Sequence, residues 1–197
     1  MATRTLYLAR HGEATPDGRL TDSGRRQARL LGERLAGVPF AGVHHSPVPR
    51  AVQTAALIGE SLPAVPAAPD EALGEYVPPV PDPTELPEVF ANFLASFTAE
   101  ELAEGAKLAV EALDRYARPA VTATRELVVT HNFVVAWFVR HALDAPDWRW
   151  LGLNLSNCAL TVIAYRDDRP PTVVAVNDMA HLPPPLRWTG FPPDQHV

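Results

Sequence analysis

The chain has 197 residues, 47% of them hydrophobic, and a formal net charge of −6 at neutral pH. This length and apolar content allow an ordinary buried core, and we expect one domain over residues 1–197 rather than two full domains. The negative charge argues against nucleic acid as a partner, because binding a phosphate backbone normally needs an extended basic surface. Any phosphate group must therefore be bound in a local basic pocket.

The location of the protein is predicted from what its sequence lacks. No stretch approaches the roughly 18 uninterrupted apolar residues of a membrane span, and residues 1–5 lead into a strand-like segment rather than a signal peptide. We therefore expect a soluble, cytoplasmic protein without a membrane partner. The single Cys158 cannot form a disulfide within the chain, and its apolar setting is typical of a buried strand thiol rather than a catalytic one.

The first part of the chain alternates between strand and helix patterns. Residues 5–9 alternate as a strand does, and residues 20–36 have apolar residues at helical spacing after a possible N-cap at Thr21. Residues 40–45 predict a second short strand. The Ser-Pro pair at 46–47 then reads as an N-cap followed by proline at the first helical position. This β-α-β-α order predicts an α/β sheet.

The middle of the chain predicts an insertion at about residues 62–118. Eight prolines between positions 62 and 87 exclude a continuous helix or a central strand, so we expect a long loop or a small lid there. Residues 84–118 predict two helices, the second of them opened by a capping box of Thr98 and Glu101. The elements expected after the insertion are a buried strand at 126–130, an apolar helix at 133–143 and strands at 157–166 and 172–177.

Two histidines and two arginines stand where these elements end. His11 and His131 each follow an apolar strand, and ligands of open α/β sheets gather at the carboxyl ends of strands. Arg50 is expected in a first helical turn, where its charge and the positive helix terminus would reinforce each other at an anion. Either histidine alone would fit a structural role, but Arg10 and Arg50 beside them suit a phosphoryl group, because guanidinium binds phosphate oxygens in pairs.

The histidine pair His44 and His45, with His131 or His141 as a third ligand, offers an alternative interpretation as a metal site. Adjacent residues of a strand point to opposite faces, and no acidic or cysteine ligand has the spacing of a metal motif. We therefore predict that the protein holds neither a metal nor a cofactor.

Four motifs in order resemble the histidine phosphatase superfamily, the phosphoglycerate-mutase-like enzymes. They are RHGE at 10–13, LTxxGxxQA at 20–28, SPxxRAxQTA at 46–55 and a late strand that ends in Thr-His at 130–131. The resemblance is strong over residues 5–61, clear over 126–142 and weak at 157–160. It implies a three-layer α/β/α sandwich with a mostly parallel central sheet, and a two-step reaction through a phosphohistidine.

The resemblance also implies roles for individual residues. His11 would be the nucleophile, with Arg10, Arg50 and His131 around the transferring phosphoryl group. A neutral imidazole near pH 7 suits a nucleophile. Asn132 stands where the family usually has glycine, and we place it with the phosphate-binding residues. The residues expected to orient this group are Gly12, Glu13 and Ser46.

A proton donor for the leaving oxygen is also required. Leu73-Gly74-Glu75 resembles the segment that carries the acid in many members, so Glu75 is the candidate general acid and later the base that activates water. The glycines that usually follow are replaced by residues 76–79. Asp70 and Glu71 remain as substitutes, and a solvated loop carboxylate without catalytic function is the alternative.

The function expected from these residues is a metal-independent phosphatase that acts on a small phosphorylated molecule. The insertion is short beside that of the cofactor-dependent phosphoglycerate mutases, and residues 78–87 offer no basic cluster for a second acidic group. We therefore favour a phosphatase over such a phosphotransferase. A phosphohistidine protein phosphatase and a non-catalytic phospholigand-binding module are further alternatives, and the sequence makes no prediction of oligomeric state.

Overall fold

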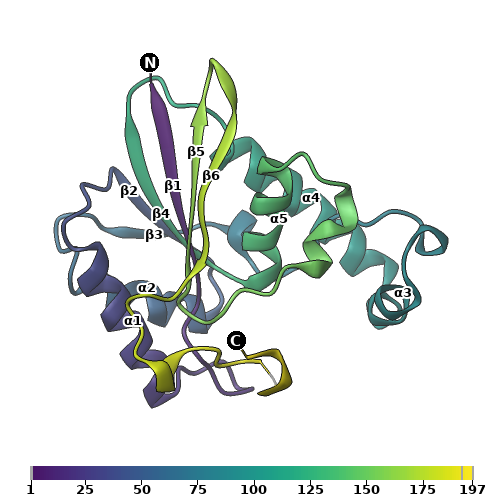
Figure 1. Cartoon of the computed structure of the whole chain (residues 1–197), viewed down its shortest axis with the longest axis horizontal. Helices are drawn as coiled ribbons and strands as arrows, with labels where there is room; N and C mark the ends of the chain where they lie inside the picture. The colour runs from purple at the N-terminus through teal and green to yellow at the C-terminus, as the bar shows by residue number, and fades with distance from the viewer. Residues whose placement is uncertain (1, 192, 197) are drawn as a thin grey trace.

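The computed structural model describes residues 2–191 and 193–196, and its centre is a six-stranded sheet in the order β3-β2-β4-β1-β5-β6 (Figure 1). Strands β1 to β4 pair in parallel, whereas β5 pairs antiparallel with both β1 and β6. This confirms the predicted α/β class with a mostly parallel sheet. The strands are β1 Thr3–Arg10, β2 Gly42–His45, β3 Ala67–Pro69, β4 Thr124–Thr130, β5 Leu160–Arg166 and β6 Arg169–Asp178.

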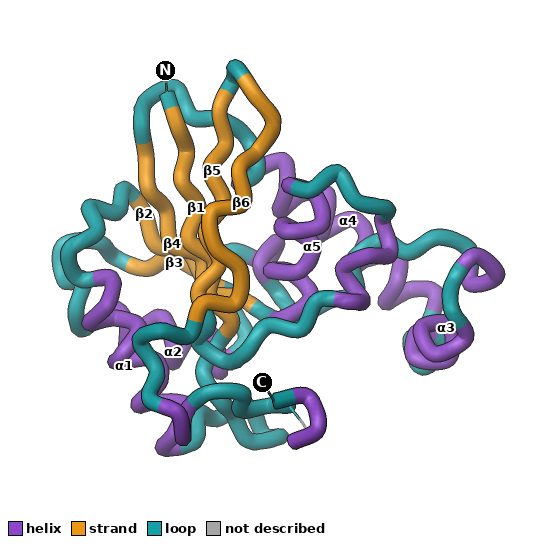
Figure 2. The backbone as a smooth tube through the Cα atoms, viewed as in Figure 1, coloured by secondary structure: helices purple, strands orange, loops and turns teal. Residues whose placement is uncertain are grey.

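Helices cover both faces of the sheet, as Figure 2 shows. Helices α1 and α2 lie on one face and α4 and α5 on the other, while the short α3 lies farther from the sheet. No helix in residues 2–191 or 193–196 has the length and apolar character needed to cross a membrane. The α-helices are α1 Asp22–Leu35, α2 Pro49–Gly59, α3 Glu88–Leu94, α4 Ala99–Tyr116 and α5 Asn132–Ala142.

Each face of the sheet buries its own apolar layer. In β1, Leu6 and Leu8 pack into the layer under α4 and α5, whereas Ala9 packs into the layer under α1 and α2. In β4, Val128 belongs to the first layer and Val129 to the second. The alternation follows from the two-residue period of a strand. Burial on both faces explains why the central strands are almost continuously apolar.

Two helix starts agree with the sequence. The Thr21 hydroxyl caps α1 by accepting a hydrogen bond of 3.0 Å from the Gly24 amide. At α4, the Thr98 hydroxyl accepts from the Glu101 amide at 3.2 Å, and the Glu101 carboxylate accepts from the Thr98 amide at 2.8 Å. Both are the local side-chain to backbone patterns that satisfy free amides at a helix start.

The start predicted for α2 is wrong. The helix begins at Pro49, its N-cap is Val48, and no side chain caps it. Ser46 lies before the helix, where its hydroxyl accepts a hydrogen bond of 3.2 Å from the Val48 amide. Proline does occupy the first helical position, as is favourable there, but it is the second proline of the motif. Arg50 still lies in the first turn.

The Pro-rich segment contains a strand that was not predicted. Strand β3 has three residues and lies at the edge of the sheet beside β2. Proline is tolerated there because an edge strand leaves one side unpaired. Cys158 is fully buried, as predicted, but it lies in the turn before β5 with φ of 54° rather than within a strand.

Gly105 is a position at which close packing excludes a side chain. A Cβ at this residue of α4 would lie 2.2 Å from the Val77 carbonyl oxygen. Gly105→Ala must therefore move the helix or the segment beside it, and we expect the free energy of unfolding to fall by about 1–3 kcal/mol. Gly59→Ala is the control, because a Cβ there would meet nothing within 4 Å. Urea denaturation of both variants measures the difference, and equal stabilities would contradict the expectation.

Candidate active site

The pairing of β1 with β4 brings His11 and His131 together. These strands are adjacent and parallel, with Arg10 opposite Thr130, and the His11 amide donates to the Thr130 carbonyl at 2.9 Å. The two imidazole ring centroids lie 5.2 Å apart at an interplanar angle of 61°. His11 is 7% exposed and His131 is 2% exposed. The structure therefore joins the two predicted histidines at one end of the sheet.

The His11 ring is held in a defined orientation. Its Nδ1–H donates to the Gly12 carbonyl at 2.8 Å, and its Nε2 accepts a hydrogen bond of 3.1 Å from the Arg50 Nε. Burial lowers the pKa of His11 to about 3, assisted by the charges of Arg10 and Arg50 and opposed by the bond to Gly12. The ring is therefore neutral at physiological pH, with its lone pair on Nε2.

The His131 ring is held by Ser46, the residue that follows β2. Its Nε2 lies 2.8 Å from the Ser46 hydroxyl, which also accepts from the Val48 amide. The hydroxyl can then donate to Nε2, and the Glu75 carboxylate on the Nδ1 side of the ring favours the tautomer with its proton on Nδ1. Within the described part of the chain this Nδ1 has no hydrogen-bond partner, and it lies 3.5 Å from Glu75 Oε1. Burial lowers the pKa of His131 to about 2, so this ring is also neutral.

Two guanidinium groups supply the positive charge beside these rings. The Arg10 Nη1 donates to the Leu155 carbonyl at 2.7 Å, and the guanidinium carbon lies 5.8 Å from the Phe191 ring centroid. Burial lowers the pKa of Arg10 to about 10, which leaves it charged at neutral pH. Arg50 forms an ion pair through Nη2 with Glu75 in addition to its bond with His11. Both arginines thus lie at the predicted place.

Glu75 is the carboxylate that reaches this group of residues. Besides contacting Arg50 and His131, its side chain is 52% exposed, so it meets both the site and solvent. The alternatives lie elsewhere. The Asp70 carboxylate accepts from Arg115 at 2.7 Å and from Tyr116 at 2.6 Å. Glu71 is exposed and does not line the cavity beside the histidines.

Gly12 and Glu13 hold the loop that carries His11. The Gly12 amide donates to the Thr54 hydroxyl at 3.0 Å, and the Glu13 amide donates to Gln27 Oε1 at 2.9 Å. The Glu13 carboxylate accepts from the Thr21 hydroxyl at 2.6 Å, so it faces the N-terminus of α1. A Cβ on Gly12 would lie 2.6 Å from a backbone oxygen of that helix. Helices α1 and α2 therefore support the loop that follows His11 through these contacts.

Asn132 lies beside the cavity, with its amide bound to the loop before β5. Its Oδ1 accepts from the Leu155 amide at 2.7 Å and its Nδ2 donates to the Leu153 carbonyl at 3.3 Å. Since the Leu155 carbonyl binds Arg10, the amide positions the acceptor that orients that guanidinium. One hydrogen of Nδ2 remains for a ligand.

A cavity of about 260 Å³, which we call the strand-end cavity, opens beside these residues and is lined by Arg10, His11, Glu75, His131 and Asn132. Its other walls include Phe133, Asn154 and the C-terminal residues Gly190, Phe191 and Gln195. Figure 1 shows the C-terminal segment at the same end of the molecule as the carboxyl end of β1. This wall was not predicted from the sequence, because its residues carry no local pattern and reach the site only through the fold.

The C-terminal segment is tied to the histidine loop by side-chain amides. Gln27 Nε2 donates to the Leu186 carbonyl at 2.8 Å and to the Thr189 hydroxyl at 2.7 Å. Asn157 Nδ2 donates to the His11 carbonyl at 2.9 Å. Asn157 was not predicted either, and its one signal in the sequence is an amide shortly before an apolar strand. These bonds make the last residues part of the site.

The two histidines of β2, His44 and His45, have different contacts. The His45 Nδ1–H donates to the Ser46 carbonyl at 2.8 Å, whereas the His44 ring packs 5.3 Å from the Tyr116 ring centroid. In residues 2–191 and 193–196, no three or more His, Cys, Asp or Glu side chains are grouped so as to hold a metal ion.

Curated relatives of the chain are named as protein phosphatases. The Caenorhabditis elegans protein named serine/threonine-protein phosphatase Pgam5, mitochondrial, is 34% identical over 191 residues, which cover 93% of this chain and 66% of the relative. The human PGAM5 of the same description is 30% identical over 195 residues, covering 93% of this chain and 65% of the relative. The chain thus spans just under two thirds of the length of these relatives. These relatives are named as mitochondrial proteins, which contradicts the cytoplasmic location expected from the sequence.

Solved structures confirm the fold. Bacillus stearothermophilus YhfR aligns with a TM-score of 0.69 and 24% identity, covering 90% of this chain and 98% of that one. The phosphoglycerate mutase of Plasmodium falciparum aligns with a TM-score of 0.63 and 23% identity, covering 93% of this chain and 96% of that one. Both confirm the expected phosphoglycerate-mutase-like architecture.

The family assignment rests on most of the chain. The family described as the histidine phosphatase superfamily (branch 1) matches residues 6–179, which run from β1 to the end of β6 and the residue after it. The match includes both histidines, both arginines and Glu75, whereas the C-terminal wall of the cavity lies beyond it. The chain belongs to the histidine phosphatase superfamily.

Proposed function

We propose that this chain is a metal-independent phosphatase that hydrolyses phosphate monoesters through a phosphohistidine at His11. The supporting observation is the state of that ring. It is neutral, its Nδ1–H is bound to the Gly12 carbonyl, and its Nε2 lone pair faces the Arg50 guanidinium, with the charge of Arg10 also acting on the ring. A desolvated nucleophile next to fixed positive charge suits attack on a phosphate dianion.

In the first step, Nε2 of His11 attacks phosphorus and the bond from phosphorus to the ester oxygen breaks. Arg10 and Arg50 donate to the non-bridging oxygens, and the Nδ1–H of His131 is a third donor. When the phosphoryl group binds, Arg50 exchanges its bonds to His11 Nε2 and Glu75 for the phosphoryl oxygens, which frees the Nε2 lone pair to attack. The donors are then fixed around the phosphoryl group as charge shifts in the transition state. The products of this step are phospho-His11 and the free alcohol.

Glu75 supplies the proton for that alcohol. A phosphoryl group bound by Arg50 would take over the guanidinium contact that Glu75 makes in the structure. The released Glu75 acts in its acid form: it gives its proton to the leaving oxygen, becomes a carboxylate, and recovers a proton from water in the second step. In the second step the Glu75 carboxylate accepts a proton from water, the water oxygen attacks phosphorus, and the phosphorus–nitrogen bond breaks. Inorganic phosphate and neutral His11 result.

Hydrolysis is favoured over phosphotransfer by the exposure and walls of the site. Glu75 is half exposed, so water reaches the proposed base. Apart from the proposed catalytic residues, the described lining carries no charge to hold a second acidic group; it consists of Asn132, Phe133, Asn154, Gly190, Phe191 and Gln195. The complete set of side chains for both steps argues against a module that binds without turnover.

A phosphorylated protein is a second candidate substrate beside the small molecule expected from the sequence. The relatives named as serine/threonine-protein phosphatases favour it. Phosphoserine and phosphothreonine are alkyl phosphates, whose poor leaving groups make a proton donor important. The proposed reaction is the same for both candidates, so an assay must include small esters and phosphopeptides.

His11→Ala tests the proposed nucleophile. We expect the variant to lose at least about 1000-fold in kcat, because the covalent step cannot occur. The measurement is phosphate release from small esters and phosphopeptides in chelator-treated buffer, with alkaline denaturing quenching to trap an acid-labile, alkali-stable phosphoryl label in the wild type. His141→Ala, at the far end of α5, is the control. Undiminished turnover by folded His11→Ala would overturn the proposal.

Glu75→Gln tests the proton donor. We expect kcat for alkyl phosphates to fall by about 100-fold or more, since an amide cannot donate the required proton. Aryl phosphates with good leaving groups should lose less than about tenfold in the rate of phosphoenzyme formation, which rapid-quench kinetics measures. Glu71→Gln is the matched control from the same segment. Equal losses on both ester classes would count against Glu75 as the acid.

The neutrality of the histidine pair predicts a pH effect on stability. Because burial lowers the pKa of His131 to about 2, whereas an unfolded histidine titrates near about 6.5, acidification from pH 7 to 4.5 protonates the unfolded chain first. Stability must therefore fall over this range. His131→Asn should lose less, by on the order of 2 kcal/mol, in urea titrations at several pH values. His196→Asn, an exposed ring, should follow the wild type; identical pH slopes for all three proteins would refute the premise.

A further inference from the structure

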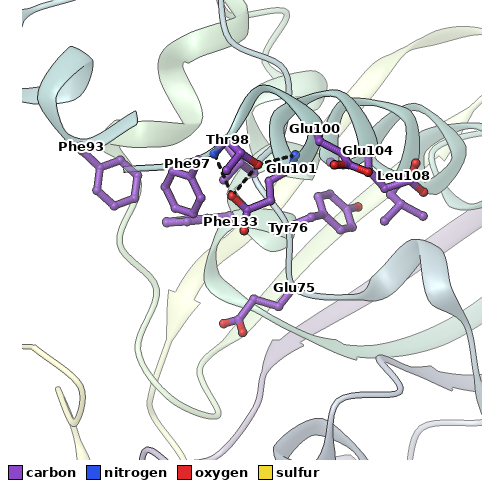
Figure 3. Close-up of a pocket in the computed structure, with 12 residues that line it drawn as sticks. Glu75, Tyr76, Phe93, Phe97, Thr98, Glu100, Glu101, Glu104, Leu108 and Phe133 are labelled. Carbon is purple, nitrogen blue, oxygen red and sulfur yellow. Dashed lines mark hydrogen bonds between the residues drawn. The ribbon is translucent and has the colours of Figure 1, made fainter. Parts of the chain in front are cut away.

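A second and larger cavity adjoins the strand-end cavity. Its volume is about 740 Å³, and Glu75 and Phe133 line both spaces. We call it the aromatic cavity. Figure 3 shows Tyr76, Phe93 and Phe97 around it, with α4 along one side and Glu75 apart from the helix. A substrate oxygen protonated by Glu75 would carry its leaving group toward this space.

Aromatic rings form one wall of this cavity. The Phe93 ring centroid lies 5.4 Å from that of Phe97 and 5.9 Å from that of Phe133, and both pairs meet edge to face. Phe93 is 39% exposed. Aromatic rings that remain open to solvent can bury the apolar part of a ligand. The volume is also in the range of roughly 300–1,000 Å³ found for small-molecule pockets.

Acidic side chains form the other wall. Helix α4 presents Glu100, Glu101 and Glu104 to the cavity, as Figure 3 shows. Glu101 is held by the Thr98 cap, and Glu104 lies 3.4 Å from Lys107 in an exposed pair of the kind that contributes little. Among the described residues that line the cavity there is no lysine, arginine or histidine. The lining is therefore negative.

We propose that the aromatic cavity is the leaving-group subsite, and that it selects phosphate monoesters whose leaving group joins an apolar or aromatic part to a positive charge. This inference rests on the proposed function of His11. A carboxylate in the leaving group would be repelled by the α4 carboxylates, whereas an ammonium or guanidinium group would be attracted to them and to the aromatic faces. Such a group can belong to a small aromatic amine or to a phosphopeptide with aromatic and basic neighbours.

The test compares two aryl esters that differ in charge. Phosphotyramine carries an ammonium group, and phosphorylated hydroxyphenylpropionate carries a carboxylate on the same ring. We expect kcat/KM to favour phosphotyramine by about tenfold, equivalent to about 1.4 kcal/mol. The preference should shrink to about threefold or less in the Glu100→Gln/Glu104→Gln variant and at high salt, because exposed charges are screened. Glu111→Gln, which lies further along α4 beside Arg115, is the charge control and should keep the full preference.

The aromatic half of the proposal has its own variant. Phe93→Ala should lower kcat/KM for both aryl esters by about fivefold relative to ethyl phosphate, because the lost ring contact is apolar and independent of charge. Phe93 is partly exposed, so the change leaves the core intact. Equal kcat/KM losses on aryl and ethyl esters would exclude a ring contact with the leaving group.

Binding to His11→Ala separates this proposal from the proposed function. Titration calorimetry with the two esters needs no turnover, so a preference for phosphotyramine in this variant supports the subsite even if the wild type hydrolyses neither ester. Phosphoserine peptides flanked by Arg and Phe, or by Glu, form the second arm. A cationic preference confined to peptides assigns a protein substrate, and one confined to small esters assigns a small molecule. Equal affinities and rates in both arms would overturn the subsite while leaving the phosphatase proposal intact.

Discussion

The parallel pairing of β1 with β4 is the constraint on which the site depends. It places Arg10 opposite Thr130, so the residues that follow, His11 and His131, leave the sheet side by side. A shift of this pairing by one residue would exchange the two faces of β4, moving Val128 and Val129 into each other's layers. The apolar layers on both faces therefore hold the imidazoles in register. Ser46 leaves the neighbouring β2 at the same edge and completes the arrangement.

The electrostatics of the site follow from this burial. Both imidazoles are neutral because charging them would cost solvation, so the positive field comes from the guanidinium groups alone. A guanidinium keeps its charge where an ammonium would tend to lose a proton, which makes arginine the suitable residue at this depth. Arg10 remains charged despite burial, whereas Arg50 forms an ion pair with Glu75, which is partly exposed to solvent. The site therefore combines a buried histidine, His11, with a carboxylate that is in contact with solvent, Glu75.

Local patterns were the reliable part of the sequence. The Thr21 cap, the Thr98–Glu101 box and the two strand-end histidines depend on neighbours within a few residues, and the structure has each of them where it was expected. The helix start predicted at Pro47 was wrong because Pro49 fits the same local rule, and the turn closed by Ser46 decides between them. Strand β3 was not predicted for a related reason, since a strand of three residues is stabilised only by its pairing with β2.

Long-range contacts account for what the sequence could not predict. Asn132 was expected at the phosphate, yet its amide is bound mainly to a loop more than twenty residues later in the chain. The C-terminal wall of the strand-end cavity depends on contacts across most of the chain, such as Gln27 with Thr189. Asp70, Glu71 and Glu75 are close together in sequence, but Glu75 follows the short 3-10 turn at residues 71–73, whereas Asp70 and Glu71 stand at its start. Such choices are made by the tertiary fold.

The side chain of Gln27 links two parts of the molecule that are distant in sequence. Its oxygen can only accept and faces an amide of the His11 loop, while its nitrogen can only donate and faces the C-terminal segment. This polarity cannot be reversed without opposing like groups in a buried place. A glutamate of the same shape would set a carboxylate oxygen against the Leu186 carbonyl, and a leucine would leave acceptors and donors unsatisfied on both sides. Gln27 therefore fixes the orientation of its own amide. A displacement of residues 186–189 would move this amide and, with it, its hydrogen bond to the Glu13 amide in the loop after His11.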